Sequence, residues 1–150
     1  MKNRITILCM LLLSLSAVAT KAQVRQVKKS STFHQLPASI NFTETQLAQL
    51  LNTTAGQQVN LPLDNNFVFS GIVTSNQLKY NNLQTVVIKL PAFSNTLLSL
   101  SKQSNNTIIT YVGRIFNPAF ADGFVLKKIK SSNYQLVKIN TENILTDCSL

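Results

Sequence analysis

Side chains able to act as acids, bases or nucleophiles are sparse in this chain. His34 is its only histidine, and its five acidic residues are Glu44, Asp64, Asp122, Glu142 and Asp147. A serine-hydrolase triad would have to use His34, yet the sequence contains no G-x-S-x-G motif. Because acid–base catalysis requires such groups to be assembled in one place, we expect no catalytic residue and interpret the chain as a non-enzyme.

Ligands for metals and cofactors are equally few. A zinc site needs about four nitrogen or sulfur ligands, and beyond residue 22 the chain offers only His34 and Cys148. It has no D-x-D-x-D-G calcium loop and no glycine-rich phosphate-binding loop. We therefore predict no metal and no cofactor. Cys148 with His34 is a conceivable nucleophile pair without a supporting motif, so a small hydrolase of unusual design ranks third among the functions considered.

The N-terminal residues have the pattern of an export signal. Two basic residues near the start precede the uncharged residues 5–19, and the small residues Thr20 and Ala22 follow. Signal peptidase recognises this combination, whereas an apolar stretch of about 15 residues is short for a membrane span. We predict that residues 1–22 are a signal peptide, with a cut after Ala19 as the close alternative. The protein is then exported, to a periplasm or to the extracellular space.

Cleavage after residue 22 would leave a basic chain with one cysteine. The removed segment carries three of the 14 basic residues and no acidic one, which leaves 11 against 5 and a net charge of +6. No later apolar run reaches the roughly 18 residues of a membrane span, so we expect no transmembrane segment there.

Cys148 either pairs with a second chain or is a half-buried apolar side chain. We favour burial, because free cysteine is usually buried.

One helix pattern stands ahead of a series of strand patterns. We interpret residues 23–38 as a lead-in, either flexible or an edge strand, and residues 39–150 as a single β-rich domain. Thr43 and Gln46 have capping-box spacing, and leucines at helical spacing follow them. This pattern predicts one short helix over about residues 44–52.

Six later segments have the alternation or the β-branched and aromatic composition of strands. They cover residues 67–74, 83–90, 96–101, 107–116, 124–129 and 134–139. Because the strands follow one another without intervening helices, they favour an antiparallel arrangement. We predict a mainly β fold, a small antiparallel barrel or sandwich of about six strands with one short N-terminal helix.

Lysines gather near the C-terminal strands. Lys127, Lys128 and Lys130 lie close together, and strand alternation places Lys127 on the face opposite the other two. Nucleic-acid sites usually combine basic residues with aromatic ones on one open face. We therefore expect no nucleic-acid partner and interpret the lysines as protection of a strand edge. Weak attraction to an acidic polysaccharide or an anionic membrane surface stays open.

Residues 111–123 combine the features of a contact surface. Gly113 allows close backbone approach, and aromatic and arginine side chains are the types that dominate interface energies. The candidate binding residues are Tyr111, Arg114, Phe116, Phe120 and Asp122. In the competing interpretation, both phenylalanines fill the core and Arg114 pairs with Asp122 at the surface.

Three short motifs follow one another along the strands. They are F-x-G-x-V at residues 69–73, Y-x-G-R-I at residues 111–115 and D-G-F-x-L at residues 122–126. In this order they resemble the β-rich prosegment-like domains of secreted bacterial metalloproteases, over about residues 67–139. The resemblance implies a noncatalytic folding aid or inhibitor of a protease. Because the sequence has no H-E-x-x-H motif, it implies here a stand-alone secreted β domain that contacts another protein.

The function expected from these patterns is noncatalytic. We predict an exported β-rich protein-interaction or folding-aid module whose partner is another exported or surface protein. The alternative is a small β-barrel carrier whose interior holds an apolar ligand. The interior separates the two, since a ligand needs an empty volume on the order of several hundred Å³, whereas a filled core favours the interaction module.

Overall fold

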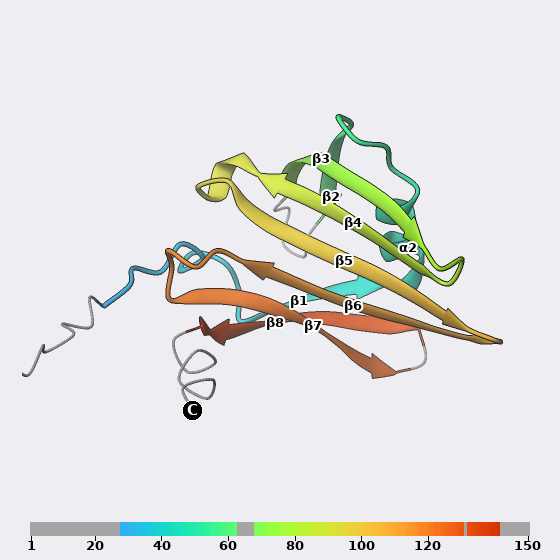
Figure 1. Cartoon of the computed structure of the whole chain (residues 1–150). Helices are drawn as coiled ribbons and strands as arrows, with labels where there is room; N and C mark the ends of the chain where they lie inside the picture. The colour runs from blue at the N-terminus through green and yellow to red at the C-terminus, as the bar shows by residue number, and fades with distance from the viewer. Residues whose placement is uncertain (1–27, 63–67, 131, 142–150) are drawn as a thin grey trace, which may run out of the picture.

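The described part of the chain forms one curled antiparallel sheet with a short helix on its concave side (Figure 1). The computed structural model describes residues 28–62, 68–130 and 132–141. Its strands are β1 Ser39–Thr43, β2 Gln58–Pro62, β3 Val68–Lys79, β4 Leu83–Leu90, β5 Thr96–Asn105, β6 Ile108–Phe116, β7 Asp122–Lys130 and β8 Asn133–Asn140. The α-helix α2 spans Glu44–Leu51, and a single 3-10 turn, η3, spans Pro91–Phe93.

The strand order is β1-β8-β7-β6-β5-β4-β3-β2, with every neighbouring pair antiparallel. Strands β2 to β8 form a meander, and β1 joins at its far side, where Ser39 pairs with Val137. The sheet curls into a half-barrel whose two edges, β1 and β2, are connected by α2 (Figure 1).

The predicted mainly β, antiparallel fold with one short helix is confirmed, but the strand count of about six was too low. The described residues contain eight strands in one curled sheet. The two strands that the sequence did not indicate, β1 and β2, are five residues long and form the edges. Short strands paired on one side only carry a weak alternation signal, which is why they were missed.

Helix α2 begins at the predicted capping box. The Gln46 backbone N–H donates to Thr43 Oγ1 at 3.2 Å, and the Thr43 N–H donates to Gln46 Oε1 at 2.8 Å. Its buried side chains, Leu47, Leu50 and Leu51, face the sheet, where the helix contacts β1, β4 and β5. No helix among the described residues is long and apolar enough to cross a membrane.

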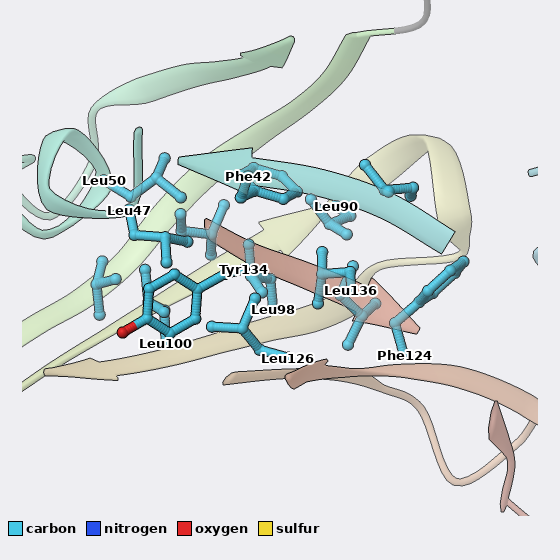
Figure 2. Close-up of a cluster of buried hydrophobic side chains, with 14 of the residues drawn as sticks. Phe42, Leu47, Leu50, Leu90, Leu98, Leu100, Phe124, Leu126, Tyr134 and Leu136 are labelled. Atoms are coloured by element: carbon cyan, nitrogen blue, oxygen red, sulfur yellow. The ribbon is translucent and has the colours of Figure 1, made fainter. Parts of the chain in front are cut away.

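The core fills the concave side of the half-barrel. Figure 2 shows leucines and aromatic rings from β1, α2, β5, β7 and β8 converging there. The alternation predicted for β6 is confirmed, because Tyr111, Gly113 and Ile115 are buried while Val112 and Arg114 are exposed. A cavity between α2 and the sheet measures about 10 Å³, which is at most the room that one water molecule needs.

The described part of the lead-in packs against one end of the half-barrel. Over residues 28–38 the chain has bends and turns and no strand. Phe33 is fully buried, with its ring centroid 5.1 Å from that of Phe93 and 5.4 Å from that of Phe124. Leu36 is buried beside them. The lead-in therefore closes this end of the core with its own side chains.

Several sequence predictions concern residues outside the described part. These include the signal peptide over residues 1–22, residues 23–27 of the lead-in, Cys148, and the acidic residues Asp64, Glu142 and Asp147. They stay predictions.

Candidate functional site

The five candidate binding residues do not form one site. Tyr111 is buried in the core, where its ring makes an edge-on contact with Tyr134 at a centroid distance of 5.5 Å. Burial raises the pKa of the Tyr111 phenol, and Glu44 and Tyr134 raise it further. The expectation that Tyr111 contributes to a binding surface was wrong, because strand alternation turns it inward with Ile115.

Asp122 is an internal anchor. Its carboxylate accepts hydrogen bonds from the Ser31 hydroxyl and from the backbone N–H groups of Thr32, at 2.8 Å, and Phe33, at 2.9 Å. Burial alone would raise the pKa of Asp122, but these hydrogen bonds, together with the charge of Lys138, lower it below its ordinary value. The Asp122 carboxylate is thus engaged by hydrogen bonds from the lead-in. The expected surface pairing of Asp122 with Arg114 is not formed.

Lys138 acts on the same segment from β8. Its Nζ atom donates to the backbone carbonyl oxygens of Phe33, at 2.8 Å, and Leu36, at 2.7 Å. The ammonium also lies 5.8 Å from the centroid of the Phe124 ring. We call Asp122 and Lys138 the lead-in clasp, because together they satisfy backbone donors and acceptors of the same short segment.

Arg114 lies on the opposite, convex side of the sheet. Its guanidinium carbon is 6.0 Å from the centroid of the Phe116 ring, which is within cation–π range. On the neighbouring strands, Leu97 pairs with Phe116, and Val125 pairs with Arg114. Val112 lies two residues before Arg114 on the same face.

These outward side chains form one surface, which we call the convex patch. It consists of Leu97, Val112, Arg114, Phe116 and Val125. Leu97 is 45% exposed and Val112 is 60% exposed, and Phe116 and Val125 are partly exposed. Lys89, beside Leu97 in the register, adds a second positive charge. The acidic residues that the structure describes, Glu44 and Asp122, belong to other parts of the molecule.

Gly113 has a packing role. A Cβ atom there would meet the Ser99 carbonyl oxygen at 3.3 Å, and Leu100 and Leu126 at 3.4 Å. The residue lets β5 and the core leucines pack closely on the concave side. The close backbone approach expected at Gly113 is thus made by the neighbouring strand β5 of the same chain.

Phe120 lies in the turn between β6 and β7. It is half-buried, and its backbone N–H donates to the Asn117 carbonyl at 3.1 Å. Its own carbonyl accepts from the Thr141 hydroxyl at 2.7 Å. Phe120 therefore belongs with the clasped end of the sheet, and of the five candidates Arg114 and Phe116 remain together on an exposed surface.

A second hollow, which the sequence did not reveal, lies between α2 and β2. We call it the seam groove; its volume is about 250 Å³. Its lining comprises Phe42, Gln46, Gln49, Leu50, Thr53, Gln57, Gln58, Val59 and Asn60. The glutamines and asparagine of residues 46–60 were a usable signal, but β2 had not been identified. Because no lining residue titrates near neutral pH, the groove suits hydrogen bonding rather than acid–base chemistry.

The described fold is a mainly β half-barrel. Comparison with known proteins assigns it to no family. No family model, curated protein or solved structure matches the chain. The resemblance to metalloprotease prosegment-like domains consequently stays a prediction. Among residues 28–62, 68–130 and 132–141, no three histidine, cysteine, aspartate or glutamate side chains are grouped as a metal ion would require.

Proposed function

We propose that the chain is a noncatalytic exported domain that binds another exported or surface protein through the convex patch, as an interaction or folding-aid module. The observation that carries the proposal is Arg114 lying over Phe116 among exposed aliphatic side chains. Arginine and aromatic residues supply most of the energy in protein interfaces when a partner excludes water from them. Exposed apolar patches on a folded domain often mark such contacts.

Charge indicates what the partner must provide. Arg114 and Lys89 are cations on the convex side, and none of the acidic residues that the structure describes is available to neutralise them there. A partner with carboxylates around an apolar centre is complementary to this surface. A second copy docking through the same patch would place like charges opposite each other, which disfavours a face-to-face dimer.

The alternative of a carrier for an apolar ligand has less support. Ligand pockets commonly measure about 300–1,000 Å³, whereas the cavity in the described core measures about 10 Å³. The seam groove is larger, but hydroxyl and amide side chains make up much of its lining. Such a lining does not suit a purely apolar molecule.

The proposal is tested by capture of partners with the tagged protein from its own periplasmic or culture fraction, with chemical cross-linking and identification by mass spectrometry. Arg114→Ala should weaken capture of a specific partner at least about tenfold, as expected when an interface arginine is truncated. Gln103→Ala is the matched control, since Gln103 is exposed on the neighbouring β5 but outside the patch. Equal capture by wild type and Arg114→Ala, with unchanged melting temperatures, would contradict the proposal.

A further inference from the structure

Three hairpins end at the same rim of the half-barrel, opposite the lead-in. They join β3 to β4, β5 to β6 and β7 to β8, and Figure 1 shows their ends together on the right of the sheet. Neighbouring strands lie about 4.8 Å apart, so the outer two hairpin ends are separated by roughly 20 Å along the sheet. This rim is a broad row of projections and contains no pocket among the hollows described above.

The hairpin ends expose large apolar side chains, which we call the rim cluster. It consists of Leu78, 66% exposed, Tyr80, 87% exposed, Ile108, 67% exposed, and Ile129, 54% exposed. Tyr80 and its neighbour Asn81 both have positive φ angles, 55° and 57°. Asparagine is common in this conformation, but tyrosine is not. A large exposed ring therefore stands where glycine or asparagine would be the ordinary choice.

Lysines accompany the rim cluster on the outer hairpins. Lys79 adjoins Tyr80, and Lys127, Lys128 and Lys130 are exposed on the distal half of β7. The described pairing of β7 with β6 is confined to Arg114 with Val125 and Ile115 with Phe124, and its distal half pairs with β8. The distal half of β7 is therefore a strand edge on the side of β6, which agrees with the interpretation of these lysines as edge protection.

Of the two acidic residues that the structure describes, Glu44 lies near this rim. Glu44 begins α2, and its backbone N–H donates to the Ser132 carbonyl in the β7–β8 hairpin at 3.0 Å. The four lysines outnumber it. The Lys128 Nζ atom lies 5.8 Å from the centroid of the buried Tyr134 ring. The Lys128 side chain is nevertheless exposed, so its charge stays at the surface. The rim is therefore strongly positive around an apolar row.

We propose that the rim cluster docks onto the surface of a lipid bilayer that contains anionic phospholipid, without crossing it. Tyrosine and aliphatic side chains are typical of the boundary between lipid headgroups and acyl chains, and neighbouring lysines bind anionic headgroups. Separate projections carrying apolar tips can enter a fluid boundary together. A second copy is a poorer occupant, because it would bring the two sets of lysines against each other. The rim cluster is a different surface of the molecule from the convex patch, which we propose binds a protein.

The chain offers a clean probe of this docking, because it contains no tryptophan. Tyr80→Trp places a single reporter at the rim, and Val112→Trp places one on the convex patch, at a residue that is 60% exposed. Both variants carry the same N-terminal residues, so any effect of residues 5–19 on lipid is common to them. Vesicles of equimolar phosphatidylcholine and phosphatidylglycerol are compared with vesicles of phosphatidylcholine alone.

We expect the Tyr80→Trp emission to shift to shorter wavelength, and brominated lipid to quench it, with the anionic vesicles. The Val112→Trp emission should stay unshifted. Leu78→Ser combined with Tyr80→Ser should weaken vesicle binding about tenfold, since two apolar side chains no longer enter the bilayer boundary. Lys79→Gln with Lys130→Gln should reduce the dependence of binding on phosphatidylglycerol and on salt. Circular dichroism confirms that each variant is folded.

Three results would overturn the proposal. One is an equal response of the two tryptophan variants, which would assign lipid contact to another part of the chain. Another is vesicle binding without a spectral shift at residue 80, which would show attraction of charge alone. The last is unchanged vesicle binding by the Leu78/Tyr80 serine variant. Loss of protein capture by Arg114→Ala tests the other surface, so the two proposals fail or stand separately.

Discussion

The two ends of the half-barrel use the same kinds of side chain in opposite ways. At the clasped end, Lys138 lies over the Phe124 ring and donates to two backbone carbonyls, so its charge and the aromatic surface are both engaged internally. At the rim, Lys79 and Tyr80 are exposed side by side. Residue type alone therefore does not distinguish a structural contact from a recognition surface. The contacts of the side chain make that distinction.

The largest expected effect comes from the aromatic group at the clasped end. Phe33→Ala removes a fully buried ring that packs on Phe93 and Phe124. It should lower the free energy of unfolding by about 3–5 kcal/mol, the usual cost for a buried phenylalanine. Urea unfolding measures this difference. Tyr80→Ala at the rim is the matched aromatic control and should change stability by less than about 1 kcal/mol. Similar losses for both would remove the contrast between the ends.

The carboxylate of the clasp should give the next largest effect. Asp122→Asn keeps the shape but loses the charge that accepts three hydrogen bonds from the lead-in. We expect a loss of about 1–3 kcal/mol, because buried donors lose a strong acceptor. Urea unfolding at neutral pH again measures it, and a variant as stable as wild type would show that the lead-in docks without the clasp.

The same carboxylate predicts how stability depends on pH. Folding lowers the pKa of Asp122, so the folded chain holds the ionised form more tightly than the unfolded one. Its contribution is present above the unfolded pKa of about 3.9 and is lost as pH falls through the lower folded value. Below about pH 4 the wild type should therefore lose stability more steeply than Asp122→Asn. Parallel pH profiles for the two would contradict this.

A smaller effect is expected where the core approaches the rim. The Tyr134 hydroxyl is buried and has no hydrogen-bond partner among the described residues. An unpaired buried hydroxyl destabilises the fold, so Tyr134→Phe should leave stability unchanged or raise it by up to about 1 kcal/mol. Thermal and urea unfolding measure the change. A clear loss would mean that the hydroxyl has a bound partner that stabilises the native state.

A comparably small effect is expected at the tip of the β3–β4 hairpin. Tyr80→Asn places a residue that tolerates positive φ where an exposed tyrosine now has φ 55°. Stability should rise by roughly 0.5–1 kcal/mol, while vesicle binding falls. A gain in stability together with a loss of lipid binding would sharpen the contrast between the ends. A loss of stability would show that the Tyr80 ring makes a contact important for the fold.

Local patterns predicted the local parts of this fold. The capping box at Thr43 and Gln46 involves neighbouring residues, and the alternation through Tyr111 and Ile115 is a property of one strand. Both are visible in the sequence because the interactions that cause them span a few positions. The helix and the strand β6 were predicted for that reason, but alternation alone did not show which face of β6 is buried.

Contacts between distant segments were beyond the same reasoning. Asp122 and Gly123 have the composition of a turn, yet they begin β7, because they pair with Asn140 and Ile139 of β8. The Asp122 side chain is also held by a segment about 90 residues earlier. A Cβ atom at Gly123 would collide with the Ile115 carbonyl, 2.6 Å away, which explains why glycine is needed there. Only the contacts in the structure show that residues 111–123 contribute separately to the core, to the lead-in clasp and to the convex patch.

The pairing of β1 with β8 sets an order in which the sheet can form during synthesis. Strands β2 to β8 can assemble hairpin by hairpin, but Ser39 must wait for Val137, which is made nearly a hundred residues later. Such a distant pairing carries a high entropic cost of loop closure and slows folding. The sheet consequently stays incomplete until the residues of β8 have been synthesised. If the chain is exported unfolded, as we propose, this delay keeps the sheet from closing until β8 has been translocated.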